Sequence, residues 1–346
     1  MLKKNLEALC LLNGVSSWEN EVRAHLRARA EKAHADSIRV DGMGSLIVHK
    51  KGKRPGGVKL MLCAHMDEVG LMITKITDEG YLKLDTVGGI DRRVLIGKPV
   101  AVGRSGVPGV IGLKAIHLTT QAERRTVPPL EQFYIDIGAG TRAEAEKVTH
   151  VGDLAAFVSD CVEFGDHMLK AKAIDDRVGC AVMAELMERD LPMDCTFAFT
   201  VQEEVGTRGA FGAAFSEKPD IALILEGTTA ADSPTVPEHK RVCGPGGGPV
   251  VPYMDGGTIY DRKLFELLRD LAEENGLPWQ TKEYVSGGTD ARAVQRSRSG
   301  VRVAAISAAV RYLHAPSSVA SLRDIDNMYA LTRAFVDAVA AGRVMK

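Results

Sequence analysis

The sequence has almost no excess of charge of either sign. Its 346 residues include 44 lysines and arginines against 45 aspartates and glutamates, which gives a formal net charge of -1. Proteins that bind nucleic acid or anionic membranes usually carry a basic surplus. The sequence also lacks any apolar stretch approaching the roughly 20 residues needed to span a bilayer. We therefore predict that neither nucleic acid nor a membrane is a partner.

Paired cysteines are also missing, because no Cys-x-x-Cys spacing occurs. A disulfide framework or a zinc finger would show regular cysteine spacings, which are absent here. Several cysteines stand in apolar runs, so we interpret them as reduced core residues and predict a cytoplasmic protein. The six are Cys10, Cys63, Cys161, Cys180, Cys195 and Cys243.

Two sequence textures alternate along the chain. Helical periodicity follows Ser16 and Glu19, and again Ser321 and Asp324, two pairs with the spacing of a capping box. From about residue 70 to 165, short β-branched pieces separated by turns predict a small barrel or sandwich. This pattern indicates an α/β domain interrupted by an all-β insertion. Further helices are expected at 175–190 and 260–278, and buried strands at 58–64, 196–202, 221–225 and 301–307.

Histidines and acids stand at or just beyond the ends of these four strands. In open α/β sheets, ligands bind at the carboxyl ends of the strands. Buried carboxylates repel one another and are costly to desolvate, and two divalent cations would remove that cost. Mixed nitrogen and oxygen donors suit zinc or a neighbouring transition metal, so the pattern predicts a two-metal hydrolytic site. The residues are His65, Asp67, Glu203, Glu204, Glu226 and His314, with Asp175 and Asp176 at the mouth of a helix.

We expect the adjacent glutamates Glu203 and Glu204 to have different roles. Neighbouring residues of a strand point to opposite faces, so we expect one to bind metal and the other to face the attacking water. Asp176 we interpret instead as the cap of a helix beginning at Arg177. A single acid at a strand end is more often a cap or a surface residue, so the joint placement carries the prediction.

These residues lie in motifs that resemble the M42 metallo-aminopeptidases, the family of glutamyl aminopeptidase and the tetrahedral aminopeptidases. The motifs run through most of the chain and include AHMDEVG, AIDDRVG, VQEEVGTRGA, SGGTDARAVQRSRSGV and RYLHAP. The resemblance implies a three-layer α/β/α zinc-peptidase domain made of residues 1–68 and 165–346. It also implies a small β-barrel oligomerisation domain inserted at 69–164, and a homo-oligomer that in this family is often a dodecamer.

The resemblance further implies an aminopeptidase that removes N-terminal residues from peptides with a free N-terminus. Glu203 would be the general base, and the carboxylate of Asp67 would orient the histidine ligand His65. The two ions would be Zn²⁺ or Co²⁺, with Mn²⁺ as a third option. Residue 226 is usually aspartate in this family, and the longer glutamate makes the geometry there less certain. The metal ligands implied are His65 and Glu226 for one ion, Glu204 and His314 for the other, and Asp175 bridging both.

Three other functions stay open at this stage. A metal-dependent carboxypeptidase or deacylase would recognise a substrate carboxylate with an arginine, and Arg177, Arg292 and Arg311 stand near the motifs. A glycosidase using two carboxylates would leave the histidines His65 and His314 without a role. A non-catalytic assembly protein would not need the complete set of donors.

Overall fold

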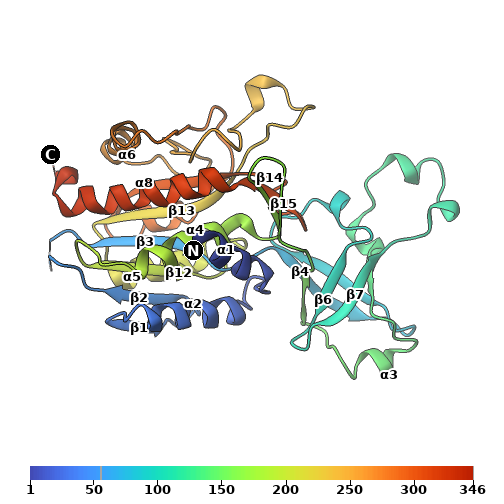
Figure 1. Cartoon of the computed structure of the whole chain (residues 1–346). Helices are drawn as coiled ribbons and strands as arrows, with labels where there is room; N and C mark the ends of the chain where they lie inside the picture. The colour runs from blue at the N-terminus through green and yellow to red at the C-terminus, as the bar shows by residue number, and fades with distance from the viewer. Residues whose placement is uncertain (55–56, 346) are drawn as a thin grey trace.

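The computed structural model describes residues 1–54 and 57–345. It consists of a nine-stranded sheet flanked by helices and a separate six-stranded closed barrel (Figure 1). The predicted α/β fold with an inserted barrel is therefore confirmed. Within the described residues, no helix is long and apolar enough to cross a membrane, and all six cysteines are free.

The large sheet has the strand order β1-β2-β12-β3-β13-β14-β15-β11-β10. Its central strands β12, β3, β13 and β14 are mutually parallel, so their carboxyl ends meet at one edge. The strands are β1 Ser37–Val40, β2 Leu46–Lys50, β3 Leu60–His65, β10 Val162–Phe164, β11 Met168–Ala171, β12 Cys195–Thr200, β13 Ile221–Thr229, β14 Arg302–Arg311 and β15 Ser318–Ser321.

Helices cover both faces of this sheet, because its buried strands carry apolar side chains on both sides. Leu62 and Leu225 belong to the core packed by five helices, whereas Cys63 and Ile224 belong to the core packed by the other two. The first group is α1 Leu2–Leu11, α2 Asn20–Lys32, α4 Ile174–Met187, α6 Arg262–Glu274 and α8 Leu322–Ala340. The second group is α5 Arg208–Glu217 and α7 Ala291–Gln295. The result is the predicted three-layer arrangement.

The barrel lies beside this layered domain (Figure 1) and has the strand order β4-β5-β8-β7-β6-β9. It has its own core, which includes Leu71, Leu82 and Phe133. A small cluster containing Val15 and Leu154 packs the barrel against the loop after α1. The barrel strands are β4 Gly70–Ile76, β5 Leu82–Val87, β6 Pro99–Val102, β7 Val107–Gly112, β8 Tyr134–Asp136 and β9 Leu154–Phe157, and a short helix, α3 Arg142–Ala145, lies between β8 and β9.

One of the two predicted capping boxes is correct. The Ser321 hydroxyl accepts a hydrogen bond from the Asp324 N–H at the start of α8, at 3.3 Å. The other prediction is wrong, because α2 begins at Asn20 and Ser16 lies outside it. The Ser16 hydroxyl instead donates to the buried carboxylate of Asp67, 2.6 Å away, so it is a donor rather than a helix cap.

Candidate active site

Strand alternation places two of the predicted ligands on the same face of the sheet. His65 is the last residue of β3, and Glu226 lies in β13. Both continue the face that carries Cys63 and Ile224. The prediction that Glu226 follows a strand ending at residue 225 is wrong. β13 runs on to Thr229 because β14 pairs with it along its whole length.

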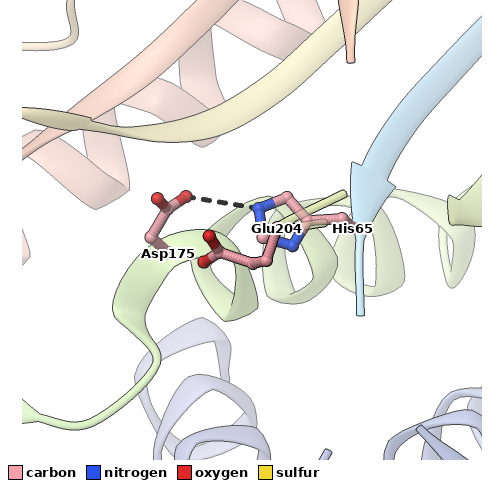
Figure 2. Close-up of side chains that lie close together, drawn as sticks. All are labelled: His65, Asp175 and Glu204. Carbon is pink, nitrogen blue, oxygen red and sulfur yellow. Dashed lines mark ion pairs between the residues drawn. The ribbon is translucent and has the colours of Figure 1, made fainter. Parts of the chain in front are cut away.

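The carboxylate of Asp175 lies between the two predicted histidine ligands. Its Oδ1 is 3.5 Å from His65 Nε2, and its Oδ2 is 3.8 Å from His314 Nε2. Glu226 Oε1 lies 3.8 Å from His65 Nε2, and Glu204 Oε2 lies 3.1 Å from His314 Nε2. Figure 2 shows the approach of His65 to Asp175, with Glu204 alongside. The structure thus brings all five predicted ligands together, with one histidine on each side of Asp175.

Both histidine rings are oriented by backbone carbonyls. His65 Nδ1 lies 3.1 Å from the carbonyl oxygen of Asp67, and His314 Nδ1 lies 2.9 Å from that of Gly89. A carbonyl oxygen only accepts hydrogen bonds, so Nδ1 carries a hydrogen in each ring, and Nε2 is the atom that faces the acids and would bind a metal ion. Gly89 follows β5, so the barrel takes part in the site.

The charge balance of the cluster suits divalent cations. Burial, together with the charge of Asp175, raises the pKa of Glu204 to about 8 although His314 opposes the shift. Burial and the charge of Asp176 likewise raise the pKa of Glu226 well above its usual value. Glu226 Oε2 is buried and has no hydrogen-bond partner among the described residues. Bound cations would supply both the missing partner and the missing positive charge, so these residues fit a metal centre.

The two adjacent glutamates lie in a turn and not in a strand. β12 ends at Thr200, and Gln202 adopts a φ of 57°, so the predicted strand alternation of the pair is wrong. The carboxylate of Asp67 fixes the turn, because Oδ1 accepts the N–H of Glu203 at 3.0 Å and Oδ2 accepts that of Glu204 at 3.1 Å. The Glu203 side chain is half-buried, and its carboxylate has no hydrogen-bond or ion-pair partner within the described chain.

Asp176 is close enough to His65 and Glu226 to share a metal ion with them. Both of its oxygens are already engaged, however. Oδ1 accepts the N–H of Gly179 at 2.9 Å, and Oδ2 accepts the N–H of His65 at 3.0 Å. Asp175 and Asp176 have non-helical φ/ψ, so the first of these bonds caps the regular part of α4 that begins at Arg177, as predicted. The second bond anchors the strand end that carries the histidine.

The arginines near the motifs are mostly occupied. Arg177 is fully buried, and its Nε donates to the carbonyl of Met66 at 3.0 Å. Arg311 pairs with Asp232 at 2.6 Å. Arg292 is half-buried, and its Nε has no partner among the described residues. Neither Arg177 nor Arg311 is thus free to receive a substrate carboxylate.

Sequence reasoning missed several buried polar residues around the site. Lys172 and Glu68 form a buried ion pair of 2.6 Å. Asp290 is fully buried, accepts the Thr200 hydroxyl at 2.6 Å, and has its pKa raised to about 6, chiefly by burial. Glu68 and Asp290 lie within quoted motifs, but the residues they contact are distant in the sequence. The one sequence signal for Glu68 and Asp290 was that each acid stands in a motif next to a strand or helix expected to be buried.

Comparison with known proteins identifies the family. The sequence model described as M42 glutamyl aminopeptidase matches residues 44–331. The chain belongs to the M42 aminopeptidase family. A relative from Acetivibrio thermocellus is 40% identical to this M42 chain over 320 residues, covering 92% of this chain and 93% of the relative.

Solved structures agree with the M42 assignment. The TET aminopeptidase from the marine sediment archaeon Thaumarchaeota archaeon SCGC AB-539-E09 is 31% identical, with a TM-score of 0.94 over 99% of this chain and 98% of that one. The Pyrococcus horikoshii TET1 peptidase is 34% identical, with a TM-score of 0.86 over 97% of this chain and 99% of that one. This M42 protein is therefore an aminopeptidase, a hydrolase of class EC 3.4.11 in a metal-dependent family. The carboxylate-recognising hydrolase is not favoured.

Proposed function

We propose that this aminopeptidase works with two divalent ions held by the five side chains around Asp175. The observation that supports it is that each carboxylate oxygen of Asp175 faces the Nε2 of a different histidine, at 3.5 and 3.8 Å. His65 and Glu226 would hold one ion, and Glu204 and His314 the other, with Asp175 shared. Zn²⁺ or Co²⁺, with Mn²⁺ as a third option, would there lower the pKa of a water molecule and polarise the scissile carbonyl.

We assign the general base to Glu203. Its carboxylate is half-buried beside the cluster and has no partner within the described chain, so it is free to accept a proton. Its backbone is held in place by Asp67. Glu203 takes a proton from the attacking water and returns it to the amine that leaves. Asp67, whose backbone carbonyl faces His65 Nδ1, supports the ligand and the base together.

We propose further that the substrates are peptides with a free N-terminus. The resemblance of this chain to a Pyrococcus horikoshii peptidase that assembles into a tetrahedron or an octahedral shell supports a homo-oligomer, with a dodecamer as the tetrahedral form. In that assembly residues 1–68 and 165–346 would be the catalytic domain, and residues 69–164 the oligomerisation domain. The six free cysteines support a cytoplasmic location.

Aminoacyl chromogenic amides test this proposal, before and after chelation and with each metal added back. Free-amine substrates should be cleaved only with metal present, and N-acetylated ones should resist cleavage. Glu203→Gln keeps the shape but removes the base, so we expect kcat to fall by about 10²–10⁴-fold while two ions per chain remain bound. Glu79→Gln, the same change at an exposed position, is the control. Full activity of Glu203→Gln would contradict the assignment of the base.

A further inference from the structure

The carboxylate of Asp67 connects several parts of the site. It is fully buried (0% exposed) and accepts the two backbone N–H groups of Glu203 and Glu204. Its third short contact is with the hydroxyl of Ser16, which donates to Oδ2 at 2.6 Å. His65 Nδ1 lies 3.4 Å from Oδ1, farther than from the Asp67 carbonyl. The position of this carboxylate therefore sets the position of the turn that carries both glutamates.

Ser16 is itself held rigidly, so its hydroxyl has a fixed position. Its N–H donates to the carbonyl of Glu68 at 3.2 Å. The loop before it is bound to the same residue, because Glu68 N–H donates to the Gly14 carbonyl and the Gly14 N–H donates to Glu68 Oε1, each at 2.9 Å. Lys172 in turn pairs with Glu68. Ser16 is only 2% exposed, so water cannot easily replace its hydroxyl.

We propose that Ser16 is a positioning residue for catalysis, and this inference rests on the proposed role of Glu203. Its hydroxyl holds the Asp67 carboxylate in the orientation that presents one oxygen to each glutamate N–H. Hydrogen bonds from a hydroxyl to a carboxylate are roughly twice as strong as neutral ones. Without this donor, Oδ2 keeps only the Glu204 N–H, and the carboxylate can turn away from the pair. Among the described residues, no hydrogen bond joins Ser16 to the five ligands or to the Glu203 side chain, so the proposed effect runs through Asp67.

Steady-state kinetics on the best amide substrate test this role. Ser16→Ala should lower kcat by about 10–100-fold, the range for partners of metal ligands, and leave KM within about twofold. Ser16→Thr retains the hydroxyl and should recover most of the lost kcat. Ser45→Ala is the matched control, because Ser45 is equally buried but its hydroxyl has no hydrogen-bond partner among the described residues. Its kcat should equal that of the unchanged protein.

A double-mutant cycle separates this role from simple structural support. If Ser16 acts through Asp67, Ser16→Ala should cost little further kcat in an Asp67→Asn background. If the double variant instead loses kcat by the product of the two single losses, the inference is overturned. It is also overturned if Ser16→Ala has a lower melting temperature but an unchanged kcat. If Ser16→Ala does not fold, Ser16→Cys keeps the shape with a weaker donor, and unchanged kcat in that variant would be equally decisive.

The same kinetics distinguish this inference from the proposed function. An unchanged protein that cleaves no amide with any metal would overturn both. An active unchanged protein and an equally active, folded Ser16→Ala would overturn the positioning role alone and leave the assignment of Glu203 intact.

Discussion

Gly227 packs tightly against Asp175, which allows a quantitative prediction. A methyl group added at Gly227 would lie 2.8 Å from Asp175 Cβ and 2.9 Å from its Oδ1. Carbon atoms in contact prefer about 3.5–4.0 Å, so one of the two residues must move by about 1 Å. β13 pairs with β14 from Ile221 to Thr229, so the residues before and after Gly227 are both held by the sheet. In Gly227→Ala, Asp175 is therefore the residue that moves.

The expected loss follows from that displacement. A misplacement of about 1 Å in a catalytic arrangement costs about 10²-fold in rate, and overpacking costs about 1–3 kcal/mol of stability. Gly227 is not among the residues with positive φ, so alanine fits the backbone and the effect is steric. Because Asp175 faces both histidines, we expect Gly227→Ala to weaken metal binding and to lower kcat/KM by about 10²-fold.

The assay combines kcat/KM, the metal content of each chain after dialysis, and urea unfolding. Gly212→Ala is the matched control, because Gly212 lies within α5 and an added methyl would meet nothing within 4 Å. Alanine favours a helix, so this control should gain up to about 1 kcal/mol and keep its activity. A Gly227→Ala protein with unchanged kcat/KM and unchanged metal content would refute the placement of Asp175 against β13.

Two further predictions concern stability. Lys172→Met removes the nearer of the two cations that face the buried Glu68 and leaves Arg177 Nη2 at 3.4 Å, so urea unfolding should show a loss of about 3 kcal/mol, and a loss below 1 kcal/mol would argue against a desolvated pair. The hydrogen bond from Arg302 lowers the pKa of Asp261, which also caps α6. That stabilisation is present above the unfolded pKa of about 4 and is lost as pH falls through the lower folded pKa. Asp261→Asn should therefore cost about 1 kcal/mol in urea unfolding at pH 7 and much less near pH 3, and an equal cost at both would exclude the ion pair as the cause.

The sequence was most informative where residue types that bind metal stand at the ends of predicted strands. His65, Glu204 and His314 could be predicted to meet because each ends or follows a parallel strand, and such ends share one edge of the sheet. Glu226 meets them from within β13, three residues before that strand ends. Asp175, at the mouth of a helix, was predicted with them, and the family resemblance added its role as the bridging ligand. The strand boundary at Glu226 was missed because pairing with β14 extends β13 beyond its apolar run.

Contacts that depend on backbone or distant partners could not be predicted. Ser16 has the spacing of a helix cap, but the buried carboxylate of Asp67 takes its hydroxyl. Arg177 and Arg311 are equally near the motifs, yet only three-dimensional packing shows that each already has a partner. The backbone carbonyl of Gly89 could not be predicted as the acceptor from the sequence, because every residue has a backbone carbonyl.

The carbonyl of Gly89 also restricts which barrels of related proteins could be joined to this layered domain. The ring of His314 belongs to the layered domain, but its Nδ1 partner is supplied by the corner after β5, at 2.9 Å. The same corner also lies close to Glu204, since a methyl group added at Gly88 would be 3.3 Å from Glu204 Cβ. A chimaera with another barrel must reproduce this corner to keep the ring of His314 in its present orientation. Deleting the barrel would remove the carbonyl partner of His314 Nδ1, so the layered domain alone would lack a contact that orients this ring.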